Sequence, residues 1–194
     1  MRCVYVLAAG KSERFGTDKL LKHVGDKTIL EMSLDVAKTA GDVTLIVRPS
    51  FQAPGGFRIL VNGKFEEGIS SSVRLALVDA KRRRKCDEVV FFLGDMPLIS
   101  PRTVDLVLKV AEKSHALVVF PVFKGKKGFP TVVKRGAFEL LNELEGDEGF
   151  RKIIRRHPEI CEGVEVDDGG CIFDVDTAED FRTLVKALKE RGGV

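Results

Sequence analysis

The residues best suited to chemistry lie in a glycine-rich segment that directly follows the first apolar run. Residues 7–21 read L-A-A-G-K-S-E-R-F-G-T-D-K-L-L, and Lys11, Arg14 and Lys19 place three cations in this stretch. Small residues allow backbone N–H groups to approach an anion closely. This composition is typical of a cradle for a triphosphate, although a tight strand-to-helix turn with solvated lysines would look similar.

The glycine spacing argues against the two commonest phosphate-binding loops. The segment does not match G-x-G-x-x-G, and no earlier glycine precedes Gly10-Lys11-Ser12 at the spacing of a P-loop. The usual dinucleotide-binding and ATPase interpretations are therefore weakened.

Two acidic segments each follow an apolar run and could supply ligands for a metal ion. Asp95 lies in G-D-M-P at 94–97, and Asp176 lies in F-D-V-D-T-A-E-D at 173–180, with Asp174 as the reserve candidate. Mg²⁺ prefers oxygen ligands and usually takes one or two carboxylates in addition to substrate phosphates. A structural interpretation also exists for each segment, since Gly, Asp and Pro favour turns and Asp is a good helix N-cap.

The apolar pattern indicates the elements that position these residues. Continuous apolar runs predict strands at 3–7, 43–47, 89–93, 116–122, 129–133 and 171–175. Stripes at helical spacing predict helices at 29–40, 70–80, around 138–144 and 150–154, and two that begin at Ser100-Pro101 and at Asp176. This order predicts an α/β fold, a three-layer, Rossmann-like, mostly parallel sheet with helices on both faces. Ligands of such sheets bind at the carboxyl ends of the strands.

Bulk composition narrows the class of protein. The net charge of +3 over 194 residues gives no support for a nucleic-acid or membrane partner, and no apolar run reaches membrane-spanning length. The four cysteines are widely spaced without a C-x-x-C pair, which favours reduced thiols over a disulfide framework or a zinc site. We therefore expect a cytoplasmic protein whose ligands are small molecules.

The motifs also carry a resemblance to a known family. L-A-A-G-x-S-x-R-F-G-x-x-K at 7–19 and G-D-M-P at 94–97 resemble signature motifs of the nucleotidyltransferases with a glycosyltransferase-A-like fold, most closely the molybdenum-cofactor nucleotidyltransferases. The segment at 174–180 is similar to that family's D-x-D-T-P-E-D, with Ala178 where proline is usual. The resemblance covers nearly the whole chain and implies a single nucleotidyltransferase domain over residues 1–194.

The resemblance implies roles for the motif residues. The loop would bind a nucleoside triphosphate through Leu7, Ala8, Ala9, Gly10, Lys11, Ser12, Arg14 and Lys19. Arg14 and Lys19 would be catalytic cations that balance the leaving pyrophosphate, and Asp95, also catalytic, would bind Mg²⁺ together with Asp176. Asn62, Gly68 and Ser71, in a segment similar to the family's G-x-S-x-S region, would lie near the nucleotide.

A third group of residues is expected on the acceptor side. G-F-P at 128–130 and G-D-E-G at 146–149 stand where the family has G-H-P and G-D-x-G, which assigns Phe129, Pro130 and Asp147 to this side. Phe129 replaces the usual histidine and leaves the identity of the acceptor open. Lys124, Lys126 and Lys127 could attract an acceptor phosphate, although lysines in loops are more often simply solvated.

The implied reaction is Mg²⁺-dependent transfer of a nucleoside monophosphate to a phosphate acceptor such as molybdopterin, with release of pyrophosphate. Ala8-Ala9-Gly10 and Lys19-Leu20-Leu21 resemble the cytidylyl-transferring branch, which favours CTP. Three alternatives stay open: a guanylyltransferase, a transferase for sugar, polyol or cobinamide phosphates on the same fold, and a non-catalytic nucleotide-binding factor that delivers cofactor. A molybdoenzyme is a possible partner, and the intact Asp95 and Asp176 argue against a purely non-catalytic role.

Overall fold

A mostly parallel sheet runs through the molecule, as the apolar runs predict. The computed structural model describes residues 1–10, 18–83, 86–147 and 149–190. The described residues form an eight-stranded sheet in the order β10-β7-β9-β6-β1-β4-β5, with β8 paired to β7. The strands are β1 (Arg2–Ala8), β4 (Val43–Val47), β5 (Arg58–Val61), β6 (Glu88–Leu93), β7 (Val118–Phe123), β8 (Lys126–Lys127), β9 (Thr131–Lys134) and β10 (Cys161–Glu165).

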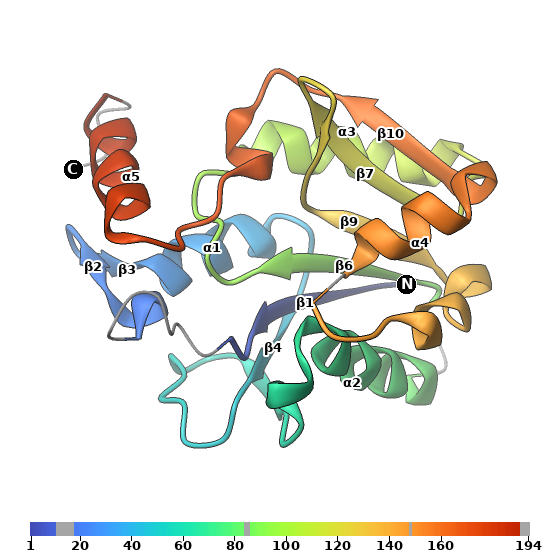
Figure 1. The fold of residues 1–194 in the computed structure, drawn as a ribbon, viewed down its shortest axis with the longest axis horizontal. Helices are drawn as coiled ribbons and strands as arrows, with labels where there is room; N and C mark the ends of the chain where they lie inside the picture. The colour runs from blue at the N-terminus through green and yellow to red at the C-terminus, as the bar shows by residue number, and fades with distance from the viewer. Residues whose placement is uncertain (11–17, 84–85, 148, 191–194) are drawn as a thin grey trace.

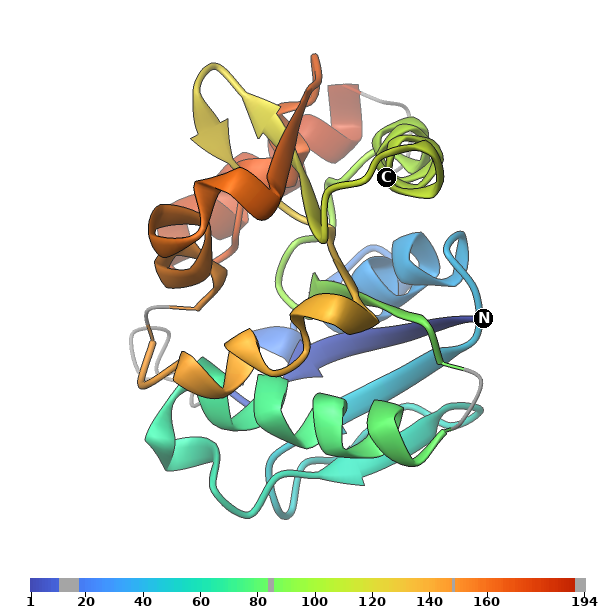
Figure 2. The ribbon, with the colours of Figure 1, turned by 90° about the vertical axis from the view of Figure 1, so that its right-hand side faces the viewer.

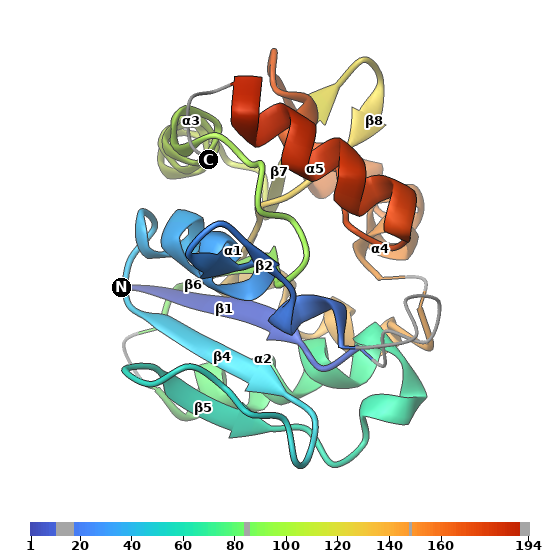
Figure 3. The ribbon, with the colours of Figure 1, turned by 90° about the vertical axis from the view of Figure 1, so that its left-hand side faces the viewer.

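The central strands β6, β1, β4 and β5 are parallel, whereas β9 runs antiparallel to both β6 and β7. The carboxyl ends of β1, β4 and β5 therefore meet at one edge of the sheet (Figure 3). This is the edge at which an α/β sheet binds its ligands.

Helices cover both faces of the sheet and make it a three-layer structure. Successive residues of β1 point to opposite faces, so Val4, Val6 and Ala8 join one core while Tyr5 and Leu7 join the other. The first core is closed by α1 (Ile29–Lys38) and α3 (Pro101–Lys113), and the second by α2 (Ile69–Arg82) and α4 (Phe150–Arg156). Figure 2 shows α2 in green beneath β1 and β4, with α1 in blue above them. The predicted fold class is confirmed.

The last helix, α5 (Ala178–Glu190), packs at one end of the molecule away from the sheet. Its Leu184 joins a small cluster with Val24 and Ile29, which places α5 against the hairpin β2 (His23–Val24)–β3 (Lys27–Thr28) and the start of α1. Figure 1 shows this arrangement on the left of the view. Consequently the segment that precedes α5 crosses the carboxyl edge of the sheet.

Several helix boundaries follow from capping that the sequence displays. Ser100 caps α3 by accepting a hydrogen bond from the Arg102 N–H at 3.2 Å, with Pro101 at the first helical position, as predicted. At α1, Thr28 and Glu31 form a capping box.

Two predicted elements are wrong. Residues 171–175 are not a strand, because a 3-10 helix at Gly169–Ile172 is followed by a stretch outside the sheet. The stripe around 138–144, where an α-helix was expected, contains only a 3-10 helix at Leu140–Glu143, and another 3-10 helix, Arg135–Ala137, precedes it. Both segments bury apolar side chains: Phe138 and Leu141 lie in the second core, and Val175 lies in the small cluster that contains Leu184. Burial alone does not distinguish a strand or helix from an irregular segment.

The cysteine prediction also needs correction. Cys3 in β1 and Cys86 just before β6 form a disulfide, with a Cα–Cα distance of 5.9 Å, while Cys161 and Cys171 are free. The two partners are 83 residues apart in sequence, and only the pairing of β1 with β6 brings them together. The expectation of four separate thiols fails for this pair.

Candidate active site

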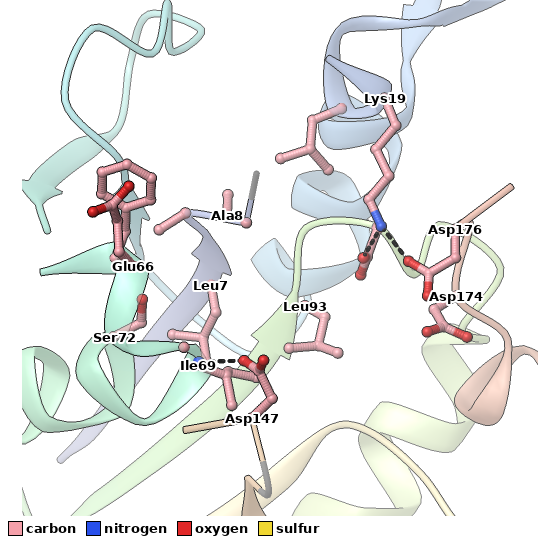
Figure 4. Close-up of a pocket in the computed structure, with 16 residues that line it drawn as sticks. Leu7, Ala8, Lys19, Glu66, Ile69, Ser72, Leu93, Asp147, Asp174 and Asp176 are labelled. Atoms are coloured by element: carbon pink, nitrogen blue, oxygen red, sulfur yellow. Dashed lines mark hydrogen bonds and ion pairs between the residues drawn. The ribbon is translucent and has the colours of Figure 1, made fainter. Parts of the chain in front are cut away.

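A cavity of about 610 Å³ opens at the carboxyl ends of β1 and β6. One wall carries Glu66 and Ser72, and the opposite wall carries Lys19, Asp174 and Asp176 (Figure 4). The described lining residues are Leu7, Ala8, Ala9, Gly10, Lys19, Leu20, Phe65, Glu66, Gly68, Ile69, Ser72, Leu93, Asp95, Asp147, Asp174 and Asp176. We call this the first cavity.

The glycine-rich segment enters the first cavity directly from β1. Gly10 and Asp18 flank residues 11–17, and Arg48, which follows β4, binds both: its guanidinium donates to the Gly10 carbonyl at 3.0 Å and to the Asp18 carboxylate. Asp18 also caps the 3-10 helix Lys19–Leu21. Arg48 was not predicted, because an arginine that follows a buried strand gives the same sequence signal as any solvated residue. The structure shows that it ties together the two ends of the predicted phosphate-binding segment.

Asp95 and Asp176 come from distant parts of the chain and converge on one cation. The Lys19 ammonium lies 2.7 Å from Asp95 Oδ2 and 2.6 Å from Asp176 Oδ1 (Figure 4). A backbone hydrogen bond from the Val175 N–H to the Asp95 carbonyl, at 3.0 Å, holds the segment at 174–176 beside the end of β6. Two carboxylates and Lys19 thus meet in the lining of the first cavity.

Asp176 is available for this role because a neighbour caps the helix. Thr177 Oγ1 accepts a hydrogen bond from the Asp180 N–H at 3.1 Å, and Asp180 accepts one from the Thr177 N–H at 2.7 Å. This reciprocal pair is a capping box in which Asp180 takes the place that Glu usually has. The alternative interpretation of Asp176 as the N-cap of α5 is therefore excluded.

The electrostatics of this cluster reflect burial and mutual charge. Burial opposes the charge of Lys19, but the adjacent Asp95 and Asp176 outweigh it and raise the lysine pKa above its ordinary value. Asp174, which lines the same wall, has a raised pKa because partial desolvation of its carboxyl group and the nearby charges of Asp176 and Asp95 oppose its ionisation. The wall therefore carries more negative charge than one lysine neutralises.

The donor set fits a divalent cation. Asp95 Oδ1 is buried and has no hydrogen-bond partner within the described part of the chain, and a buried carboxylate oxygen of this kind calls for one. Hard oxygen ligands from two carboxylates, with the remaining positions left to phosphates and water, are what Mg²⁺ takes in nucleotide sites. No group of three or more potential metal-binding side chains occurs among the described residues, so phosphates would have to complete the shell.

The opposite wall is built from the segment that precedes α2. The Asn62 amide donates to Ser71 Oγ at 2.8 Å and to Ser72 Oγ at 2.9 Å, and its carbonyl accepts from the Lys64 N–H at 2.9 Å. Asn62 and Ser71 are buried, and Ser72 is the member of this network that lines the cavity. Asn62 thus positions Ser72 and links it to Ser71.

A second cavity, of about 400 Å³, adjoins the first. Ile69, Leu93 and Asp147 line both cavities, and Asp147 accepts a hydrogen bond from the Ile69 N–H at 3.1 Å. The other described lining residues are Lys127, Gly128, Phe129, Thr131, Gly149, Phe150, Lys152, Ile154 and Arg155. The predicted acceptor residue Phe129 therefore lies in a pocket next to the predicted nucleotide site.

The structure brings most of the predicted site residues together. Nine line the first cavity: Leu7, Ala8, Ala9, Gly10, Lys19, Gly68, Asp95, Asp147 and Asp176. Lys11, Ser12 and Arg14 lie outside the described residues. Pro130 joins Phe129 through a cis peptide bond and is not among the described residues that line either cavity. Phe65, Glu66 and Ser72 were not predicted.

The fold and the site together define a nucleotidyltransferase. The chain belongs to the MobA-like NTP transferase domain family, whose model matches residues 4–160. This confirms the family resemblance seen in the motifs.

Individual relatives span nearly the whole chain. A probable molybdenum cofactor guanylyltransferase of Aquifex aeolicus is 30% identical, over 93% of this chain and 89% of its own. The molybdenum cofactor cytidylyltransferase of Escherichia coli is 24% identical, over 95% of this chain and 96% of its own. The crystal structure of Rv0371c from Mycobacterium tuberculosis has a TM-score of 0.82 and 30% identity, over 95% of this chain and 97% of that one. That protein has also been solved with manganese, at a TM-score of 0.77, with 29% identity over 96% of this chain and 98% of that one.

The described residues contain no helix that is both long enough and apolar enough to cross a membrane.

Proposed function

We propose that this protein transfers a cytidylyl group from CTP to the phosphate of molybdopterin, with Mg²⁺ in the first cavity and release of pyrophosphate. An oxygen of the acceptor phosphate attacks the α-phosphorus, and the bond from the α-phosphorus to the oxygen of the leaving pyrophosphate breaks. Since the attacking phosphate is already anionic, the step needs no general base. Catalysis then rests on positioning and charge neutralisation.

The convergence of Asp95 and Asp176 on the Lys19 ammonium carries this proposal. It marks a position where two carboxylates hold one cation, with distances of 2.7 and 2.6 Å, at the end of the glycine-rich segment. A Mg²⁺ ion held by these carboxylates would neutralise phosphate charge and stabilise the leaving group. Lys19, together with Arg14, would then balance the charge of the pyrophosphate, and backbone groups near Ala9, Gly10 and Ser12 would hold phosphate oxygens.

The choice of CTP rests on the loop sequence, and GTP is the second candidate. Ala8-Ala9-Gly10 and Lys19-Leu20-Leu21 resemble the cytidylyl branch. The relative from Aquifex aeolicus carries the name of a guanylyltransferase, while the one from Escherichia coli carries that of a cytidylyltransferase. Both possibilities use the same cavity and the same carboxylates.

The wider setting is part of the same proposal. We place both cavities on a single domain that spans residues 1–194. A cytoplasmic location fits a substrate that is a free nucleoside triphosphate, and a molybdoenzyme would receive the product.

Thermal shift measurements with CTP, GTP, ATP and UTP, each with and without Mg²⁺, test the nucleotide site. A ligand that binds only the native state raises the melting temperature. We expect a Mg²⁺-dependent rise that is largest with CTP and lost in Asp95→Ala. Asp105→Ala is the matched control, because Asp105 is an exposed carboxylate of α3 paired with Lys109.

Each outcome decides a different part of the proposal. A shift led by GTP keeps the mechanism and moves the protein to the guanylyl branch. A shift that Asp95→Ala retains refutes the assigned metal ligand. No shift with any triphosphate, from a folded sample, refutes the nucleotidyl transfer itself.

A further inference from the structure

The first turn of α2 lies against a segment from the second half of the chain, residues 144–147. The Ile69 N–H donates to Asp147 Oδ1 at 3.1 Å (Figure 4). The Ser70 N–H donates to the Gly146 carbonyl, also at 3.1 Å. Figure 2 shows this part of the chain, in orange, directly above α2, in green. Ile69 and Asp147 line both cavities, so the walls of the two cavities are joined at this contact.

Arg74 makes a second connection, one turn further along α2. It follows Ser70 by four residues, a spacing that places both side chains on the same face of the helix. The Arg74 Nη1 donates to the Leu144 carbonyl at 2.7 Å, and its Nη2 lies 2.9 Å from Glu67 Oε2. One side chain thus binds two segments that are far apart in the sequence.

The two bonds of Arg74 are suited to fixing geometry. The side chains of Arg74 and Glu67 are 33% and 50% exposed, and an ion pair so open to water contributes little to stability. The bond to the Leu144 carbonyl is partly buried and has a charged donor, which makes such a bond about twice as strong as a neutral one. The planar guanidinium presents both donors in a rigid arrangement. Arg74 therefore holds Leu144 at a defined position relative to Glu67.

Each of the two segments leads into the wall of a cavity. Glu67 follows Phe65 and Glu66, which line the first cavity. Residue 144 precedes Asp147, which lines both cavities, and Phe150, which lines the second. Arg74 itself is not among the described residues that line either cavity. Its influence on a ligand therefore passes through the segments that it holds.

We infer that Arg74 is a positioning residue that keeps the first-cavity wall at residues 65–67 in a fixed relation to the second-cavity wall that follows residue 144. This inference rests on the proposed nucleotidyl transfer, in which the nucleotide occupies the first cavity and the acceptor the second. Reacting atoms must lie about 3–3.5 Å apart for attack. Two substrates held on separate walls therefore react only while the walls keep their spacing. Arg74 sets the alignment of the substrates, and the affinity for each depends on other residues.

Steady-state kinetics of Arg74→Met separates alignment from a general contribution to stability. The variant removes both bonds and keeps an apolar side chain. With the full chain, Mg²⁺, the preferred triphosphate and molybdopterin, we expect kcat to fall about tenfold while the KM for the triphosphate changes less than about threefold, because a misplacement of about 1 Å slows a reaction without weakening ground-state binding. Titration with the α,β-methylene analogue of the triphosphate counts the competent protein, so unfolded material does not lower kcat.

The matched control is Arg135→Met. Arg135 also donates to a backbone carbonyl, that of Cys86 at 3.2 Å, but at the amino end of β6, whereas the cavities lie at its carboxyl end. Arg135→Met should retain the wild-type kcat. An equal fall in kcat in both variants would show that any loosening of the fold slows the reaction and would overturn the inference. A raised KM with an unchanged kcat in Arg74→Met would overturn it as well.

Arg74→Lys keeps the test valid if Arg74→Met does not fold. A lysine retains the positive charge but lacks the rigid pair of donors that reaches both acceptors. We expect a kcat between those of the wild type and Arg74→Met. A fully wild-type kcat in Arg74→Lys would show that charge alone is enough and would overturn the role given to the two bonds.

Hydrogen exchange tests the connection without the acceptor. Mg²⁺ and the α,β-methylene analogue should slow amide exchange of the wild type in residues 68–72, and also in residues 140–144, which are not among the described residues that line the first cavity. In Arg74→Met the first effect should remain and the second should be lost. Equal slowing of residues 140–144 in both proteins, or slowing of residues 68–72 alone in the wild type, refutes only this inference. No slowing anywhere in the wild type refutes the proposed nucleotide site, and this inference with it.

Discussion

The two adjoining cavities differ in the balance of charged side chains that line them. Among the described lining residues, the first cavity has one cation, Lys19, against five carboxylates, namely Glu66, Asp95, Asp147, Asp174 and Asp176. The second has three cations, Lys127, Lys152 and Arg155, against the shared Asp147. The net charge of the side chains that line a cavity therefore does not fix the charge of its ligand, because an acidic cavity can bind a polyanion through a metal ion.

The same contrast separates the work done in each cavity. Charge must be redistributed during the reaction where the leaving pyrophosphate forms, and a cation held by carboxylates suits that task. In the proposed reaction the acceptor only has to be held in the correct position for attack, which requires no such redistribution of charge. Loss of a carboxylate in the first cavity should therefore act mainly on the rate, and changes in the second cavity on acceptor binding.

The largest expected effect is that of Asp95→Asn, which removes a charge from the first cavity and keeps the side-chain shape. Metal-ion stabilisation of transition-state charge contributes several kcal/mol, so we expect the rate of pyrophosphate release to fall about 10³-fold. The assay uses the full chain with CTP or GTP, Mg²⁺ and molybdopterin. Asp105→Asn, on the exposed face of α3, should retain the wild-type rate. If Asp95→Asn keeps more than about a tenth of the wild-type activity, the acidic cavity does not work through a metal.

A smaller effect is expected from Arg48→Met, which removes a side chain that bonds to Gly10 and Asp18 but is not itself among the described lining residues of the first cavity. Loss of the bonds to Gly10 and Asp18 should raise the KM for the triphosphate about tenfold. We expect kcat to change less, because Arg48 is not among the described residues that line the first cavity. Steady-state kinetics with varied nucleotide measures the two constants separately. Arg58→Met is the control, since Arg58 also binds a carboxylate, Asp79, but on β5 and outside both cavities. An unchanged KM would show that the loop is held by other contacts.

Gly68→Ala tests the junction at which the two cavities meet. Gly68 has a φ of +83°, and a Cβ there would lie 2.6 Å from Asp147 Oδ1 and 2.6 Å from the carbonyl carbon of Gly146. We expect a loss of about 1–3 kcal/mol of unfolding free energy, seen as a melting temperature lower by several degrees. Gly63→Ala, where a Cβ has open space, should be nearly neutral. Equal melting temperatures for the two variants would mean that the junction rearranges freely.

The sequence predicted the first cavity better than the second, for a physical reason. The loop, Asp95 and Asp176 follow strands or precede a helix, and parallel strands bring such positions to one edge. Lys152 and Arg155 carry no comparable signal, because a basic helix face is usually solvated. Only the folded structure, which brings Lys152 and Arg155 of α4 to the same cavity as Phe129, shows that these cations line a cavity.

The elements that failed to be predicted share a second cause. β10, with the sequence C-E-G-V-E, pairs with β7 although it lacks an apolar run, and residues 171–175 have an apolar run but stay outside the sheet. Strand formation depends on an available neighbour as well as on composition. The composition of a segment can be read from the sequence, but which strand lies next to it is known only once the chain is folded.

The smallest effect is expected from a change at Asp79, which lies outside both cavities. It tests whether a charged side chain can contribute to the free energy of unfolding without changing nucleotide binding. Arg58 donates to Asp79 at 2.6 and 2.5 Å, and the buried Tyr5 hydroxyl donates to it at 2.7 Å. These hydrogen bonds, that of Arg58 above all, outweigh burial and hold the pKa of the Asp79 carboxyl below its ordinary value. The charged carboxylate therefore stabilises the folded state at neutral pH.

The sign of the pH dependence follows from that lowered pKa. The stabilisation is complete above the unfolded-chain pKa of about 3.9 and is lost as the pH falls through the lower folded-state value. We expect the difference in unfolding free energy between wild type and Asp79→Asn to shrink as the pH is lowered from about 6 to about 2. Denaturant titrations at several pH values measure this difference, and the nucleotide-induced thermal shift should be the same in both proteins. A difference that stays constant with pH would refute the assigned role of the carboxylate, and a weakened nucleotide shift would mean that the first cavity is coupled to charges beyond its walls.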